Sequence, residues 1–209
     1  MKKIFCLAVM TACLFCCVSS YAEGPRKIGG FVLGTDISLY KDLVRMESAL
    51  PIRHMEYLTE VETKKIEGYK SGYVMYGSCV HPGRIVKIKL KYGIPDRWFF
   101  DELLSRFKKK FGQPSEWKGD PFQTLIAWKW SLKDAQNNPM AMILQHYSGD
   151  DEEYTRGNSL RLIMRGLIDQ ERKCFDQKHP EAPDERDEPS AKLSPEEKSR
   201  FDFSRFIPE

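Results

Sequence analysis

Residues 84–92 read RIVKIKLKY, and this stretch decides the fold because apolar and basic side chains alternate along it. The apolar members of the alternation are Ile88, Leu90 and Tyr92. The basic members are Lys87, Lys89 and Lys91. Successive side chains of a β-strand point to opposite faces of its sheet. The pattern therefore predicts a strand with one buried face and one basic face turned to solvent.

The same period of two recurs in five further stretches of the chain, each long enough for one strand. Two of them, 54–62 and 69–77, precede the basic strand. The other three, 122–132, 139–147 and 158–166, follow it. Six strands joined by short connections predict a sheet of antiparallel neighbours.

Two segments instead carry apolar residues at helical spacing. Residues 38–50 place apolar side chains on one helical face, after Asp36 or Ser38 as a cap. Residues 95–111 begin with Pro-Asp and end before Gly112, which is a typical helix stop. We therefore expect a helix before each set of three strands.

The expected fold class is α+β, built from two successive helix-plus-three-strand units that form one antiparallel sheet. The apolar side of each helix must be covered, and the sheet offers one apolar face. We expect both helices to pack on that face and the opposite face to be open to solvent.

The first 22 residues have the composition of a signal peptide. Lys2 and Lys3 precede an uncharged run over 4–18, and Ala22 ends a small-residue cleavage site. Cleavage after Ala22 predicts a periplasmic or secreted protein without a transmembrane segment. The alternative is a lipoprotein. Its lipidated cysteine would be Cys13, Cys16 or Cys17.

The rest of the chain divides into a body and a tail. Residues 23–175 are expected to form a single α+β domain. Residues 176–209 contain six Lys or Arg against ten Asp or Glu, with four prolines between 180 and 195, and predict a disordered acidic tail with a short C-terminal helix. The apolar residues near its end either dock on a partner or fold back onto the body. They are Phe201, Phe203, Phe206 and Ile207.

Removal of the leader would leave two cysteines, Cys79 and Cys174. A single pair of thiols in an exported chain favours a disulfide. The alternative is a metal or nucleophile role for Cys79 together with His81, which needs an exposed thiolate.

No motif predicts a cofactor, a metal or a catalytic residue. Met140, Met142 and His146 share one parity and could hold copper, but the same face fits a buried core better. The acidic run 150–153 could bind calcium weakly, but it fits a solvated loop. The expected protein is therefore not an enzyme and needs no cofactor.

The solvent face of the sheet is the candidate binding surface. Its expected members are Lys87, Lys89, Lys91, Lys129, Tyr147, Arg161 and Arg165. Such a face would attract an acidic protein, lipid head groups or a phosphorylated glycan. The alternative is an ordinary polar face, neutralised by Glu56, Glu60 and Glu62 on the first strand.

Two segments resemble known exported proteins. Residues 30–34 (GFVLG), followed by a capped helix, and 107–114 (FKKKFGQP), followed by a strand with Trp128 and Trp130, resemble small exported bacterial proteins of unknown function. They are also similar to the helix-then-hairpin units of SmpA-like outer-membrane assembly lipoproteins and to the tandem helix-plus-sheet units of β-lactamase inhibitor proteins. The resemblance implies a protein-binding module and transfers no site residue.

Together these features predict a non-catalytic binding or accessory protein of the cell envelope. The expected partner is an envelope macromolecule, a protein before a lipid or a glycan. Nucleic acid is not expected, because an exported protein rarely meets it and the net charge of +5 on residues 23–175 is spread too thinly for a dense basic patch. The alternatives are an envelope hydrolase whose site comes from distant residues, and a carrier of anionic lipid or glycan.

Overall fold

The computed structural model of the protein describes residues 24–150, 156–180 and 196. The expected signal peptide and most of the expected tail, with its four docking residues, lie outside the described residues. These docking residues are Phe201, Phe203, Phe206 and Ile207.

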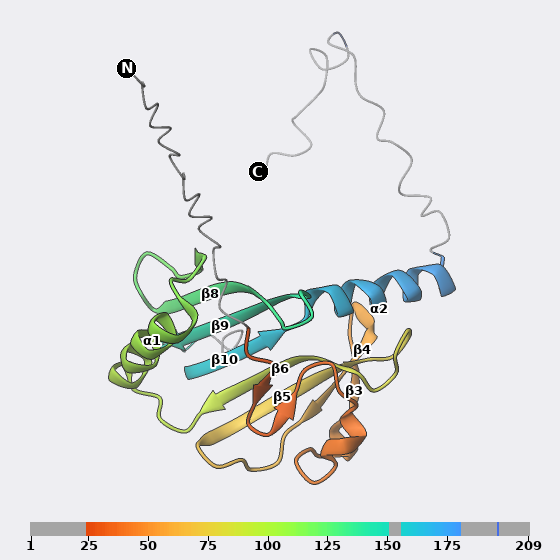
Figure 1. The fold of residues 1–209 in the computed structure, drawn as a ribbon, viewed down its shortest axis with the longest axis horizontal. Coiled ribbons are helices and arrows are strands. Elements are labelled where there is room, and N and C mark those ends of the chain that lie inside the picture. Colours follow the sequence, from red (N-terminus) through yellow and green to blue (C-terminus); the bar gives the residue numbers. More distant parts are fainter. Residues whose placement is uncertain (1–23, 151–155, 181–195, 197–209) are drawn as a thin grey trace, which may run out of the picture.

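One eight-stranded antiparallel sheet organises the described part of the chain (Figure 1). Its strand order is β3-β4-β5-β6-β10-β9-β8-β7. The strands are β3 (Leu50–Ile52), β4 (Met55–Glu62), β5 (Tyr69–Gly77), β6 (Ile85–Tyr92), β7 (Glu116–Trp117), β8 (Leu125–Lys133), β9 (Pro139–Tyr147) and β10 (Gly157–Ile163). A sheet of consecutive hairpins thus forms on each side of the central β6–β10 pair.

The α+β class and the antiparallel sheet are confirmed, and all six expected strands exist. Two of them, β5 and β9, have the expected bounds. The last expected strand is shorter than 158–166, because the chain turns into a helix at Arg165. The short outer strands β3 and β7 were not expected, since two or three residues give no readable alternation.

The prediction of a helix over residues 38–50 is wrong. The chain forms a two-stranded ribbon of β1 (Lys27–Ile28) and β2 (Phe31–Val32), followed by two short 3₁₀ turns, η1 (Ile37–Tyr40) and η2 (Met46–Ser48). The backbone of this segment forms short turns, in which the Leu43 nitrogen donates to the Tyr40 oxygen, for example. It also bonds to β4, where the Arg45 nitrogen donates to the Glu62 oxygen. Two residues of the expected apolar face, Leu39 and Leu50, are 71% and 69% exposed.

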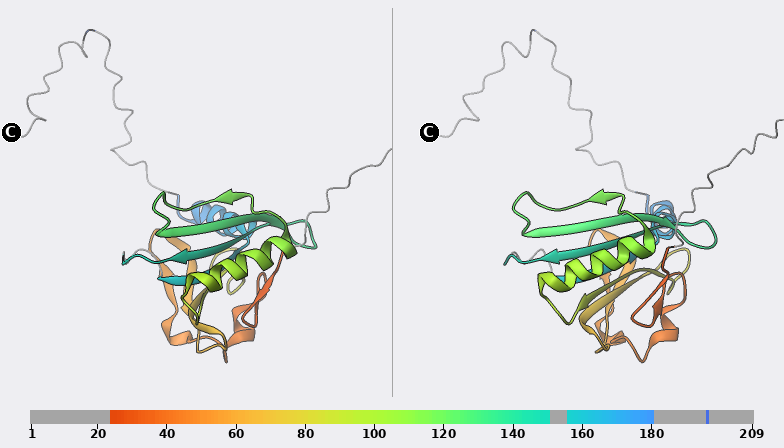
Figure 2. Two further views of the ribbon diagram at one scale, coloured as in Figure 1. Left: turned by 90° about the vertical axis from the view of Figure 1, so that its left-hand side faces the viewer. Right: turned by 60° about the vertical axis from the view of Figure 1, so that its left-hand side comes forward.

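The two helices lie on opposite faces of the sheet, so the expectation of one covered face is also wrong (Figure 2). Helix α1 (Arg97–Phe111) packs on β9 and β10. Helix α2 (Arg165–Lys178), which was not expected, packs on β4, β5, β6 and β9. It also overlaps the first three residues of the expected tail. We call the face under α1 face A and the other face B.

Face A carries the main core. Its largest fully buried side chains include Trp130 of β8, Phe100 of α1 and Phe31 of β2. The Trp130 indole nitrogen donates to the Gly112 carbonyl at 2.8 Å, so it fixes the end of α1. The N-terminal ribbon covers the part of face A that α1 leaves open, and buries Phe31 there.

Helix α2 covers only one end of face B, over a smaller cluster of Leu58, Met75 and Val86. The expected disulfide between Cys79 and Cys174 is confirmed, and it joins the β5–β6 loop to α2. The rest of face B, beyond this covered end, holds the candidate site.

Candidate anion-binding groove

Seven residues form one continuous row across face B, each opposite the next in the strand pairing. We call it the cross-sheet row. Its members, in order from β7 to β4, are Glu116, Lys129, Ile143, Arg161, Lys89, Tyr73 and Glu62. Paired residues have their side chains on the same face. The central β6–β10 pair therefore sets Arg161 directly against Lys89.

Three cations converge at the centre of this row. The ammonium nitrogens of Lys87 and Lys89 each lie 5.4 Å from the ring centroid of Tyr73. Arg161 faces Lys89 across the β6–β10 pair. We call Lys87, Lys89 and Arg161 the cation cluster. The tyrosine ring lies close enough for a cation–π interaction with both lysines, which offsets part of their mutual repulsion.

The environment of the cation cluster disfavours charge on its lysines. Burial, followed by the nearby charges of Arg161 and Lys87, lowers the pKa of Lys89 to about 8. Burial and the Arg161 charge also lower the pKa of Lys87. Burial raises the pKa of Tyr73 to about 12, so its phenol is neutral at ordinary pH. A bound anion would favour the charged form of both lysines. Its negative charge would offset the repulsion between the cations and compensate for the removal of the lysines from water.

Glu60 does not neutralise the cluster fully. Burial raises the pKa of Glu60, although Lys87 and Lys89 oppose this shift. Glu62 is engaged elsewhere, because its carboxylate lies 3.1 Å from the Arg45 guanidinium. Glu56 lines a different hollow, with His54 and His179. Among the described residues, Glu60 is therefore a carboxylate whose charge acts on both lysines of the cluster.

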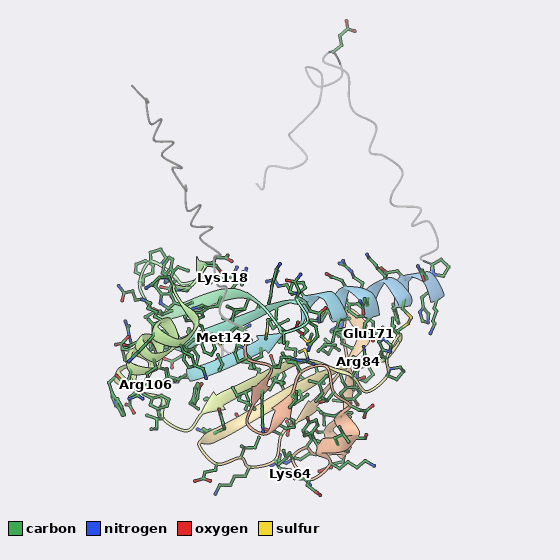
Figure 3. The ribbon with its side chains drawn as sticks, viewed as in Figure 1. Lys64, Arg84, Arg106, Lys118, Met142 and Glu171 are labelled. Carbon is green, nitrogen blue, oxygen red and sulfur yellow. A yellow bond between two sulfur atoms is a disulfide. The ribbon has the colours of Figure 1, made fainter. Side chains whose placement is uncertain are left out.

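A groove of about 580 Å³ adjoins the cation cluster. Its size is within the range of small-molecule sites. Its charged lining has six basic and two acidic side chains: Arg45, Lys64, Lys65, Lys70, Lys89 and Lys91, with Glu60 and Glu62. Lys64 lies away from Glu171 of α2 (Figure 3). We call this hollow the cationic groove; it opens on the part of face B that α2 does not cover.

The expected surface residues are only partly brought together. Lys91 lines the cationic groove. Lys129 is paired with Glu116 at 2.6 Å, far along the row. Tyr147 is 5% exposed and is the last residue of β9. Arg165 begins α2, so it is not on a strand.

Several groove residues were missed by the sequence reasoning. Tyr73 was assigned only to a strand, although its parity with Ser71 and Met75 already set it on face B. Lys64 and Lys65 lie in the connection between β4 and β5, and Lys70 is the second residue of β5. The sequence signal that could have indicated the groove was the pair of lysines in the connection at 64–65, together with the basic strand at 84–92.

The copper site that Met140, Met142 and His146 could have formed is not assembled, and most of the acidic run 150–153 lies outside the described residues. Met140 and Met142 belong to the face A core. The Nδ1 atom of His146 lies 2.7 Å from Oδ1 of Asn158, and the Asn158 amide in turn donates to two backbone carbonyls before α1. Asp150 pairs with Arg156, while 151–155 lie outside the described residues. Within the described residues, no three His, Cys, Asp or Glu side chains are grouped to hold a metal ion.

Comparisons with protein families, curated proteins and solved structures gave no match. Across the described ranges, every helix is too short or too polar to cross a bilayer. The function must therefore be inferred from the chemistry of the cationic groove.

Proposed function

We propose that this protein is an exported, non-catalytic binding protein of the cell envelope, which holds an anionic macromolecule in its cationic groove. The observation that carries the proposal is the convergence of Lys87, Lys89 and Arg161 around Tyr73. A groove lined by more cations than carboxylates favours negatively charged ligands and speeds their approach.

The electrostatic repulsion between Arg161 and Lys89 lowers the stability of the sheet, and this cost supports a functional role for the pair. Like charges directly opposite each other on neighbouring strands destabilise a sheet, and Arg161 faces Lys89 in this way. Natural proteins tolerate such destabilising residue pairs mainly at functional sites. An anionic ligand would offset the repulsion between these two cations.

Two features support work outside the cytoplasm. The disulfide between Cys79 and Cys174 is typical of proteins that fold in an oxidising compartment. The leader composition of residues 1–22 agrees with export. The envelope then becomes the place where an anionic partner would be met.

The test is crosslinked capture of envelope components on the tagged protein from residue 23 onward. The charge-reversal variant combines Lys89→Glu with Arg161→Glu. A matched control combines Lys109→Glu with Lys173→Glu, because both are exposed on helices and change the net charge equally. We expect the control to retain the wild-type partner and the charge-reversal variant to lose it.

Equal capture by both variants would overturn the groove as the binding site. A third protein, ending at Pro180, separates the groove from the tail. This end point keeps α2 whole, since the helix runs to Lys178. Loss of the partner on this truncation alone would move the function to the apolar residues of the tail.

A further inference from the structure

Four lysines line the rim of the cationic groove, and we call them the rim lysines. They are Lys64, Lys65, Lys70 and Lys91. The first three are exposed. Within the described part of the chain, none of the four forms an ion pair with a carboxylate. Glu62, which also lines the groove, pairs with Arg45 at 3.1 Å instead. The rim is therefore a surface that an acidic partner would neutralise.

The rim lysines are also crowded by one another. Burial, followed by the charges of Lys70 and Arg156, lowers the pKa of Lys91. Lys64 and Lys65 are neighbours in the connection between β4 and β5, so their charges lie within one short length of chain. Acidic side chains placed among these cations would relieve their repulsion.

The segment that follows α2 carries the opposite charge. Residues 181–197 contain seven acidic and two basic side chains, a net charge of −5. Five of the acidic side chains belong to its first eight residues, which read EAPDERDE. We call 181–197 the acidic segment. All of it except residue 196 lies outside the described residues.

The acidic segment begins within reach of the groove. The end of α2 and the start of β4 meet at one hollow, which His179 and Glu56 both line. Further along β4, Glu62 lines the cationic groove. From Glu56 to Glu62 the strand spans about 20 Å. The first eight residues of the segment reach up to about 27 Å when extended, and the whole segment up to about 56 Å.

We propose that the acidic segment folds back over the cationic groove of its own chain and competes there with the anionic ligand. Its carboxylates lie among the rim lysines. A tethered segment of this length meets its site at an effective concentration on the order of millimolar. Exposed ion pairs are individually weak, so a ligand of higher charge displaces the segment. This assignment rests on the proposed function, because it names the regulation of the same groove.

The first experiment locates the acidic segment without any ligand. A carbodiimide joins a carboxylate to a lysine amine that it contacts, and peptide mass spectrometry identifies the joined residues. The tagged protein from residue 23 onward is treated at low protein concentration and low salt. We expect crosslinks from the acidic segment to Lys64, Lys65 or Lys70, and none to Lys109 on α1. Salt at about 0.5 M should abolish these crosslinks, because it screens surface charges.

The second experiment measures the competition. The probes are a fluorescent ten-residue polyglutamate peptide and a fluorescent dextran sulfate. A neutralised variant combines Asp184→Asn, Glu185→Gln, Asp187→Asn and Glu188→Gln. It should bind the probes about fivefold more tightly than wild type, as expected when a tethered competitor covers the groove in about four of five copies. The matched variant Arg186→Gln makes the same segment more acidic, so it should bind the probes more weakly.

The outcomes separate the acidic segment from the groove itself. Equal or weaker probe binding by the neutralised variant would overturn the competition and leave the proposed function standing. Absence of crosslinks to the rim lysines would overturn the placement of the segment. Crosslinks that join two copies would assign the segment to a second molecule and overturn its folding back. Failure of both probes to bind either protein would overturn the proposed function and the regulation that rests on it.

Discussion

The carboxylate of Glu171 on α2 lies 2.7 Å from the backbone nitrogen of Cys79 in the β5–β6 loop. It also accepts hydrogen bonds from the backbone nitrogens of Val80 and His81, at 2.9 Å each. Glu171 is 2% exposed, so these bonds form away from water. One side chain thus satisfies three consecutive N–H groups and fixes α2 over its end of face B.

Replacement of Glu171 by Ala should lower the free energy of unfolding by about 3 kcal/mol. The substitution leaves three N–H groups without acceptors in a buried site, and each unsatisfied group is costly. Urea denaturation followed by circular dichroism measures the change. Gln170→Ala, at the exposed neighbouring position, should change stability by no more than about 0.5 kcal/mol. Similar losses in the two variants would contradict the role of Glu171.

Loss of the disulfide should cost about 4 kcal/mol. Its cysteines are 95 residues apart, and closing a loop of that length restricts the unfolded chain strongly. The variant combines Cys79→Ser with Cys174→Ser. Its denaturation midpoint should match that of reduced wild-type protein and lie well below that of oxidised protein. A double variant as stable as oxidised protein would show that the packing of α2 and the Glu171 hydrogen bonds secure the helix without the disulfide.

The low pKa of Lys89, about 8, predicts two pH effects. Below pH 8 the folded state bears the full cost of a charged, partly buried lysine. Stability should therefore rise as the pH increases from about 8 toward 10.5, where the unfolded lysine also loses its proton. We expect a gain of about 1 kcal/mol, reduced by solvent screening of this half-exposed group. Lys89→Met should remove this rise in a series of urea titrations at different pH.

Anion binding should follow the opposite trend. As the pH passes about 8, Lys89 loses the charge that attracts the ligand, so affinity for the anionic partner should fall. Lys89→Arg keeps its charge at these pH values and should bind with little loss up to about pH 9.5. An identical pH profile for this variant and the wild type would exclude Lys89 as the titrating group.

Two neighbouring aromatic residues on α1 should respond very differently to truncation. Phe100 is fully buried on face A, whereas Trp98 is 63% exposed. Phe100→Ala should cost about 3–5 kcal/mol, because it leaves a cavity under the helix. Trp98→Ala should cost no more than about 0.5 kcal/mol. Thermal unfolding of both variants checks the assignment, and a reversed order would contradict the packing of α1.

The strands could be predicted because their signal is local. Alternation in residues 84–92 depends on one buried and one open face, and the structure has Ile88 and Leu90 buried with Lys89 on the opposite face. Helix α1 was predicted for the same reason, since its stripe ends at Gly112. The grouping of Lys87, Lys89 and Arg161 on one face also followed from parity.

The remaining features depend on contacts between distant residues. Helix α2 has few apolar side chains, and its buried residue is the charged Glu171, which only the β5–β6 loop makes acceptable. Residues 38–50 have a helical pattern, but their backbone finds partners on β4. Parity could place Arg161 and Lys89 on one face, but only the β6–β10 pairing makes them direct neighbours.

The central β6–β10 pair also has a consequence for the order of folding. The hairpins on either side of it form from contacts close in sequence, whereas this pair joins Leu90 to Leu160. Distant strands pair late, because the entropy of closing the intervening loop must be overcome first. Lys89 belongs to one half of the sheet and Arg161 to the other. If the groove binds as proposed, the newly made chain gains this ability only when the two halves have joined, and a nascent or half-folded copy would not compete for ligand.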